Sequence, residues 1–220
     1  MPIHPEYLFL PFSISTRRQV QPMQKNEVNI KKESRKMRKN IGAKTMLYPM
    51  PVLIIGTWGE GGVANAMNAA WGGISEEREI SVCVSDDHKT TENLLRTGAF
   101  TVSVADVQNV VAADYVGIVS GNDVPDKIKR CGWTAIASEV VDAPIFEELP
   151  FALECRVKSY DKESCRLVGE IVNISVDDSI LTGGKVDLTK FRPITYDSSN
   201  HNYVALGEIV GKAFSDGRKI

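Results

Sequence analysis

Two long segments of alternating apolar and polar residues, separated by a short polar turn, constrain this chain more than any other feature of its sequence. The segments run from Phe151 to Tyr160 and from Cys165 to Val176, and the turn between them is Asp161–Ser164. A period of two residues turns one face of a strand toward a core, and a short polar turn joins antiparallel neighbours. The pattern therefore predicts a long antiparallel hairpin.

Shorter β patterns accompany the hairpin, and helical patterns are few. Val52–Ile55 is a short apolar run suited to a buried strand, whereas Ile80–Ser85 and Phe100–Val104 alternate. Several short strands with few helices favour a closed or partly closed antiparallel barrel. We therefore expect a mainly β chain.

Two short helices are expected between these strands. Thr90 is a candidate N-cap for a helix that ends at Gly98, since glycine favours the left-handed position after a helix. Asp106 is a candidate N-cap for a second helix. Its apolar face would comprise Val107, Val110, Val111 and Tyr115.

The charge of the chain is divided unevenly. Residues 1–45 carry ten Lys and Arg against three acids, a net charge of +7, whereas residues 46–220 carry a net charge of −9. Apolar residues in 1–45 follow no helical or strand period. We expect residues 1–45 to be a flexible, basic, non-globular extension and residues 46–220 to be a single folded domain.

Composition excludes several classes of protein. A net charge of −2 gives no support to a nucleic-acid-binding protein, and no window approaches the length of an apolar membrane span. The apolar run Tyr7–Phe12 is too short for a secretory signal. Four widely spaced cysteines and three histidines predict neither disulfides nor a metal site, and they favour a reducing, cytoplasmic location. No serine or histidine pattern predicts hydrolase chemistry.

A glycine-rich turn raises the alternative of a dinucleotide-binding protein. Gly59–Ala64 fits G-x-G-x-x-A, and Asp86 follows at the end of a later strand. The glycines lie several residues beyond the apolar strand, and the chain lacks the regular strand–helix alternation of a doubly wound sheet. This alternative predicts a parallel sheet.

The segment Asn65–Gly73 combines two carboxamides, small residues and Trp71. Small residues allow close backbone approach, amides supply paired donors and acceptors, and an indole supplies a flat wall. The segment is therefore a candidate site for a planar heterocycle. The alternative is an ordinary helix or strand in which Trp71 anchors the core.

The segment Ser85–Asn93 lies between a strand and a helix start, where exposed N–H groups attract phosphate. Its hydroxyl and basic side chains add to that attraction, whereas Asp86 and Asp87 oppose it unless they point outward. The alternative is a capped helix with a solvated loop.

Together these segments match a known pattern over about three-quarters of the chain. From Met46 to about Phe214, the sequence resembles the flavin reductase-like family, the FMN-binding split barrels that include flavoredoxins. The matching segments are Tyr48–Val52, Asn65–Trp71, His88–Asn93, Gly117–Gly121 with Asp126 and Lys127, Leu153–Cys155, Val168–Val172 and Tyr203–Glu208.

The resemblance implies a split β-barrel of Greek-key antiparallel strands that forms a homodimer, with noncovalent FMN near the subunit interface. It places Asn65, Ala66, Met67 and Asn68 along the isoalloxazine and ribityl, with Trp71 in the same segment. It assigns the phosphate to Ser85, His88, Lys89 and Thr90. The family usually has Thr where this chain has Asn68, so the resemblance does not define how the flavin is positioned at this residue.

Lys127 is a weaker candidate, because a cation near the flavin would stabilise the anion formed on reduction. The alternative is an exposed lysine at a helix start.

The resemblance implies an oxidoreductase that takes hydride from NAD(P)H and passes electrons to free flavin, a partner protein or a small molecule, with no catalytic side chain. An electron carrier without NAD(P)H turnover of its own is the alternative. Neither nucleic acid nor membrane is an expected partner.

Overall fold

The computed structural model describes residues 38–220, and the chain divides into two units after Ala43. The predicted extension, residues 1–45, therefore lies for the most part outside the described residues. The second unit, Lys44–Ile220, contains every helix and strand of the described part of the chain.

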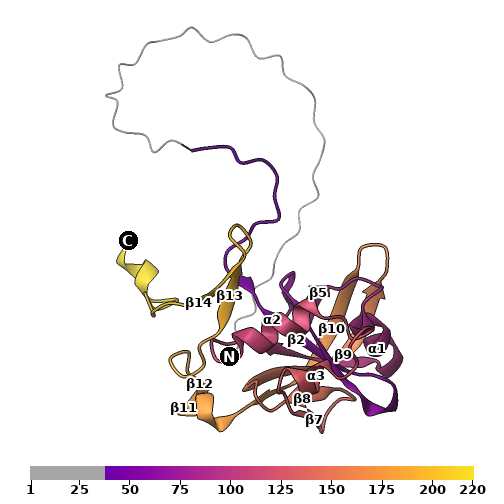
Figure 1. The fold of residues 1–220 in the computed structure, drawn as a ribbon. Helices are drawn as coiled ribbons and strands as arrows, with labels where there is room; N and C mark the ends of the chain where they lie inside the picture. The colour runs from indigo at the N-terminus through magenta and orange to yellow at the C-terminus, as the bar shows by residue number, and fades with distance from the viewer. Residues whose placement is uncertain (1–37) are drawn as a thin grey trace, which may run out of the picture. The chain divides into compact units, whose positions relative to one another are not determined.

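A curled antiparallel sheet of seven strands forms the centre of this unit (Figure 1). Its order is β3-β2-β6-β9-β10-β5-β4, and every neighbouring pair is antiparallel. The strands are β2 (Leu53–Trp58), β3 (Ala64–Ala69), β4 (Gly72–Glu76), β5 (Glu79–Cys83), β6 (Ala99–Val104), β9 (Phe151–Asp161) and β10 (Arg166–Val176).

The predicted long hairpin is confirmed and is the middle of the sheet. β9 and β10 pair over their whole lengths, from Asp161 opposite Arg166 to Phe151 opposite Val176. β5 and β6 follow one another in the chain, yet the hairpin lies between them in the sheet. This separation of consecutive strands produces the half-barrel rather than a simple meander.

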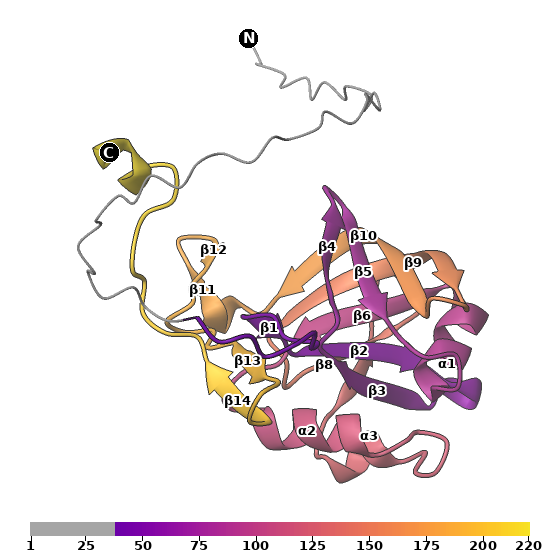
Figure 2. The same cartoon turned by 90° about the horizontal axis from the view of Figure 1, so that it is seen from above.

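Smaller elements flank the sheet. Three smaller sheets consist of short strands. The first has the order β1-β13-β14, with β1 (Met50–Pro51), β13 (Ile194–Asp197) and β14 (Asn202–Ala205). The other two pair β7 (Ala135–Ala137) with β8 (Pro144–Phe146), and β11 (Leu181–Thr182) with β12 (Lys185–Val186). The helices are α1 (Lys89–Thr97), α2 (Val110–Ile118) and α3 (Lys127–Arg130), with 3-10 turns at Glu60–Gly62, Asp178–Ile180 and Asp216–Lys219. Figure 2 shows α2 and α3 beside β3.

Strand β2 is buried on both faces, as its unbroken apolar run favours. Leu53 and Ile55 point into the barrel core, where they pack with Phe100 and Leu167. Ile54 points the other way, into a second core. This second core joins the sheet to α2, α3 and β8 through Ala66, Ala113, Val116, Ile128, Trp133 and Phe146.

The predicted end of the first helix is confirmed, but the predicted N-caps of both helices are wrong. Gly98 ends α1 in the left-handed conformation, with φ of 70°. The N-cap of α1 is His88 rather than Thr90, because His88 has an extended backbone and the helix begins at Lys89. The hydroxyl of Thr90 accepts a hydrogen bond from Asn65. Asn109, not Asp106, is the N-cap of α2.

Two further details of α2 differ from the expectation. The carboxylate of Asp106 accepts hydrogen bonds from the backbone N–H groups of Gln108 and Asn109, so it closes the turn before the helix. Val111 is 80% exposed, whereas Ala113 and Val116 are buried. The packed face of α2 therefore does not contain Val111.

The architecture confirms the mainly β, split-barrel class. All strand pairs in residues 38–220 are antiparallel, so the parallel sheet required by the dinucleotide-binding alternative is absent there. Within the same residues, no helix is both long enough and apolar enough to cross a membrane.

Candidate functional site: a groove between α1, α2 and β3

Three adjoining cavities form a groove along β3, between the start of α1 and the end of α2. The central cavity has a volume of about 230 Å³. It is lined by Asn65, Met67, Asn68, His88, Lys89, Thr90, Val116, Gly117, Ile118, Val119, Ser120, Gly121 and Lys127. A cavity of about 240 Å³ adjoins it through Asn65, Lys89 and Gly121, and one of about 320 Å³ adjoins it through Asn68, Gly117 and Ile118.

Asn65 is held in the wall of the groove by a buried polar network. Its side-chain NH₂ donates to the hydroxyl of Thr90 at 2.8 Å and to that of Thr57 at 3.4 Å, and Asn93 donates to Thr57 at 3.2 Å. The side-chain oxygens of Asn65 and Asn93 are buried without a hydrogen-bond partner within the described residues. Because unpaired buried acceptors are costly, two such oxygens beside a cavity favour a ligand that donates hydrogen bonds.

The start of α1 supplies an anion-binding end to the groove. His88, Lys89 and Thr90 line the cavity at the first turn, where the N–H groups of a helix attract negative charge. Lys89 Nζ also contacts Glu92 at 2.6 Å, so a ligand anion would share this ammonium with a carboxylate.

Asp86, which would oppose an anion here, is engaged elsewhere. Its carboxylate pairs with Lys162 of the β9–β10 turn at 2.7 Å, and that contact holds the pKa of Asp86 below its usual value. One of the two acids that opposed phosphate binding is thereby neutralised by a cation.

Lys127 is a buried cation in the central cavity. It is 3% exposed, and its ammonium donates to the carbonyls of Val116 at 3.1 Å and Val119 at 2.8 Å, at the end of α2. Burial lowers the pKa of Lys127 to about 8. The alternative of an exposed lysine is therefore wrong, although Lys127 does begin a helix.

Gly121 allows its loop to approach the side chain of Asn65 closely. A Cβ atom at position 121 would lie 2.3 Å from the side-chain oxygen of Asn65 and 3.3 Å from Lys89 Cβ. The polar groups around the elongated groove therefore comprise the donors of a helix start, basic side chains and a buried ammonium, together with amide oxygens that can accept. This set fits a ligand with a phosphate at one end and a polar ring at the other, as FMN has.

The remaining sequence-predicted residues lie outside the central cavity. Ala66 is fully buried in the second core, and Ser85 is half-buried. Trp71 is 60% exposed and lines a different hollow, formed by β4, β5 and the start of β10, so the alternative in which Trp71 anchors the core is wrong. Within this chain, Trp71 does not share a cavity with Asn65.

Two residues that sequence reasoning did not single out now belong to the groove. Asn93 supplies one of the unpaired oxygens, and Gly121 supplies the space beside Asn65. Both lie within segments that resemble the family, but their roles depend on contacts between residues far apart in the chain.

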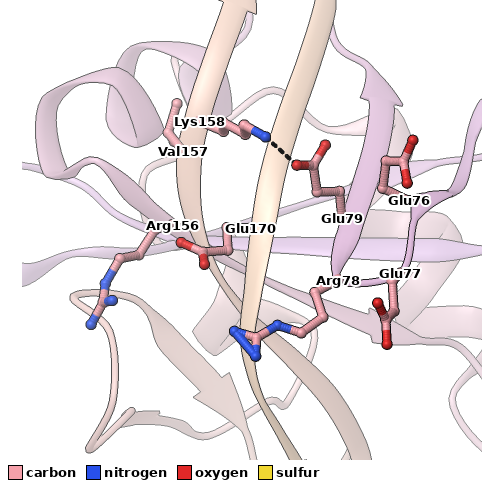
Figure 3. Close-up of a pocket in the computed structure, with 8 residues that line it drawn as sticks. All are labelled: Glu76, Glu77, Arg78, Glu79, Arg156, Val157, Lys158 and Glu170. Carbon is pink, nitrogen blue, oxygen red and sulfur yellow. Dashed lines mark hydrogen bonds and ion pairs between the residues drawn. The ribbon is translucent and has the colours of Figure 1, made fainter. Parts of the chain in front are cut away.

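A further hollow, of about 680 Å³, lies elsewhere (Figure 3). Charged side chains from the β4–β5 turn and the β9–β10 hairpin surround it: Glu76, Glu77, Arg78, Glu79, Arg156, Lys158 and Glu170, with Val157. Lys158 forms an ion pair with Glu79. We call this surface the charged hollow.

Comparison with known proteins identifies the family and agrees with the fold. The model of the flavin reductase like domain matches residues 45–203, which is more than two-thirds of the chain. The chain belongs to this family. The resemblance to this family that the sequence indicated is thereby confirmed.

Two solved flavoredoxins are similar to this flavin reductase-like chain over most of its length. The flavoredoxin of Desulfovibrio vulgaris (Miyazaki F) is 36% identical, with a TM-score of 0.79, and the match covers 82% of this chain and all of that one. The flavoredoxin of Methanosarcina acetivorans is 27% identical, with a TM-score of 0.75, over 83% and 98% of the two chains.

More distant matches support the fold alone. An FMN-binding domain of a flavin reductases-like enzyme from Shewanella baltica OS155 is 20% identical, with a TM-score of 0.67, over 74% of this chain and 88% of that one. An uncharacterized protein of Aeropyrum pernix is 27% identical over 157 residues, which are 69% of this chain but only 58% of that protein.

Proposed function

We propose that this protein is an FMN-binding oxidoreductase that accepts hydride from NAD(P)H and passes electrons to free flavin, a partner protein or a small acceptor. The observation that carries the proposal is the central cavity, where the unpaired oxygen of Asn65 and the buried ammonium of Lys127 lie close to the start of α1. The flavin reductase-like family supplies the cofactor class.

Each part of the groove has a role in this proposal. The start of α1, with His88, Lys89 and Thr90, binds the phosphate, while Ser85 supports the same loop. Asn65, Met67 and Asn68 contact the ring and ribityl, with Ala66 contributing through its backbone. Lys127 places positive charge in the cavity. Bound FMN would supply the two-electron chemistry, so no side chain acts as a general acid or base.

The assembly and location remain part of the proposal. We propose a cytoplasmic homodimer in which the exposed Trp71 lies near a subunit interface and the flavin. Residues 46–220 form the flavin-binding domain, so deletion of residues 1–40 should leave flavin binding intact. Retained absorbance near 450 nm after truncation would support this; loss of the yellow colour would show that the extension takes part.

The test of the proposal begins with the purified full chain. We expect it to be yellow or to become so on titration with FMN, and to be bleached on anaerobic stopped-flow mixing with NADH or NADPH. A colourless protein that does not quench FMN fluorescence would refute the cofactor.

An electron carrier without its own NAD(P)H turnover is the second candidate. The flavoredoxin structures, which are similar over about four-fifths of the chain, favour it. The same mixing experiment separates the two functions. The bound flavin of a carrier would stay oxidised for seconds with NADH or NADPH, yet dithionite would reduce it.

A further inference from the structure

The last residues of the chain form an arm without polar contacts to their own domain. We call residues 208–220 the C-terminal arm, which follows β14 after a short link. Both views of the fold show the arm leaving the end of β14 and lying apart from the seven-stranded sheet (Figures 1 and 2). Among the described residues, every hydrogen bond and ion pair of the arm joins two residues of the arm itself. The family match ends at residue 203, so the arm lies beyond it.

Large apolar side chains are exposed along the C-terminal arm. Ile209 is 80% exposed, Val210 is 99% exposed and Phe214 is 95% exposed. Residues 206–212 form no helix or strand. Because contact between apolar surface and water is unfavourable, a cluster of exposed apolar side chains marks an interaction site. The arm therefore has the composition of a segment that becomes buried in an assembly.

Strand β4 offers a matching surface at one edge of the sheet. It is the last strand in the sheet order, and no other strand of residues 38–220 pairs with its outer edge. Trp71, just before β4, and Ile74 within it are both more than half exposed. They line a hollow of about 360 Å³, together with Cys83 and Arg166. An exposed strand edge with apolar side chains can bind an extended segment of another chain.

The two surfaces also carry opposite charges. Glu76 and Glu77 are exposed where β4 ends, whereas Arg218 and Lys219 are exposed near the end of the arm. Residues 208–214 can span about 23 Å when extended, which approaches the diameter of a small domain. No residue of the arm lines the hollow beside Trp71 within one chain. Length and charge therefore favour the hollow of a second copy as the place where the arm binds.

We propose that two copies of this chain exchange their C-terminal arms, so that Phe214 of each copy occupies the hollow beside Trp71 of the other. Phe214 lies between the Trp71 indole and the Arg166 guanidinium, since aromatic rings pack together and a guanidinium is attracted to the face of a ring. Residues around Val210 pair with the free edge of β4. The inference rests on the proposed homodimer and names the segments that join it. It does not depend on FMN or NAD(P)H.

Analytical ultracentrifugation of the full-length protein measures the dissociation constant of the dimer. Phe214→Ala and Trp71→Ala should each raise this constant about tenfold or more, because each removes a large aromatic side chain from the contact. Leu95→Ala, which truncates a half-exposed apolar side chain on α1, is the matched control and should leave the constant unchanged. A monomeric wild type, or equal constants for Phe214→Ala and Leu95→Ala, would overturn the exchange.

A cross-link shows which copy receives the arm. Phe214→Cys places a thiol in the arm, and Cys83 supplies an exposed thiol in the hollow. Oxidation by diamide, which accepts two electrons from the two thiols, should link the arm to Cys83 of the partner subunit. The product should be a covalent dimer on non-reducing gels, absent from Phe214→Cys/Cys83→Ala.

A disulfide within a single chain, identified by peptide mapping, would contradict the exchange, and so would the absence of any cross-link. Titration of the same wild-type sample with FMN tests the proposed function separately. A protein that exchanges its arms but does not bind FMN would refute the proposed cofactor and leave the arm exchange standing. A protein that binds FMN without any cross-link would do the reverse.

Discussion

The charged hollow and the groove along β3 differ in the one property that points to ligand binding. The charged hollow, at about 680 Å³, exceeds each single cavity of the groove, but its charged side chains are solvated, with Lys158 and Glu79 already paired. The groove consists of smaller cavities, yet its walls contain a buried ammonium and two buried amide oxygens without partners.

This difference in unpaired buried groups, rather than cavity volume, favours the groove as the ligand site. Exposed ion pairs contribute little to folding stability, because water solvates both charges. A buried oxygen without a hydrogen-bond donor destabilises the protein, and a ligand that donates to it removes that cost. Substitutions in the groove should therefore change flavin binding, whereas equivalent substitutions in the charged hollow should not.

The largest effect is expected from filling the space beside Asn65. Gly121→Val places a Cβ atom 2.3 Å from the Asn65 side-chain oxygen, so the polar wall must shift. We expect FMN affinity, measured by fluorescence quenching, to fall about 5- to 150-fold, the range that overpacking of about 1–3 kcal/mol produces. Gly207→Val is the matched control, because a Cβ atom there meets nothing within 4 Å. Equal losses in both variants would contradict the role of this space.

Removal of the buried cation should have the next largest effect. Lys127→Met keeps the length of the side chain but removes the ammonium that donates to Val116 and Val119. We expect FMN affinity to fall about tenfold, as for a lost charge-assisted hydrogen bond. Lys158→Met makes the same chemical change in the charged hollow and should leave the affinity unchanged. If the two variants behave alike, the contrast between the regions fails.

The pH dependence of the same residue sharpens the comparison. With a pKa of about 8 in the ligand-free protein, Lys127 is charged below pH 8 and loses its charge above it. FMN affinity should therefore decrease as the pH rises through 8 and beyond, since the bound anion itself favours the protonated lysine. Titrations from pH 6.5 to 9.5 should show this slope in the wild type and a flatter profile in Lys127→Met.

The contribution of Lys127 to folding stability changes with pH in the opposite direction to its contribution to FMN affinity. Between pH 8 and about 10.4, Lys127 keeps its proton in the unfolded chain but has lost it in the folded protein. The contribution of Lys127 to the free energy of unfolding therefore increases as the pH rises through this range. Urea denaturation of the ligand-free protein at pH 7.5 and 9.5 should show that contribution as a difference between wild type and Lys127→Met.

A smaller effect is expected at the loop before α1. Lys162→Ala releases Asp86 from its ion pair, so a free carboxylate then lies near the phosphate end of the groove. We expect FMN affinity to fall two- to threefold at low salt and less at high salt, because exposed charges are screened. The double variant Lys162→Ala/Asp86→Ala should recover wild-type affinity. If it does not, Lys162 acts by another route.

The smallest effect should come from the charged hollow itself. Glu79→Gln removes the carboxylate that pairs with Lys158, a contact between partly exposed groups. Flavin affinity and the melting temperature should remain close to those of the wild type, as calorimetry and fluorescence quenching would show. A clear loss of FMN would mean that the hollow, not only the groove, contributes to the site.

The strands of this fold could be predicted from the sequence because their periods are local. The alternation in 151–176 and the apolar run at 52–55 depend on neighbouring residues, and both correspond to strands in the structure. The helix starts were less predictable. Thr90 has the chemistry of an N-cap, but its hydroxyl accepts from Asn65, 25 residues earlier in the chain.

The sequence indicated which segments form the candidate site, but it did not indicate most of the contacts within that site. Asn65, Met67, Asn68, His88, Lys89, Thr90 and Lys127 line one cavity, as their shared resemblance indicates. The burial of Lys127 and the exposure of Trp71 could not be derived from local patterns. Both depend on how α2, α3 and β4 pack against distant strands.

Strand β2 has a consequence for how the domain unfolds. Its alternate side chains belong to two different cores, one inside the half-barrel and one beneath α2 and α3. Neither core can lose its order without exposing a face of the strand that completes the other. The two halves should therefore melt in a single cooperative transition, and amide hydrogens of β2 should exchange only through global unfolding.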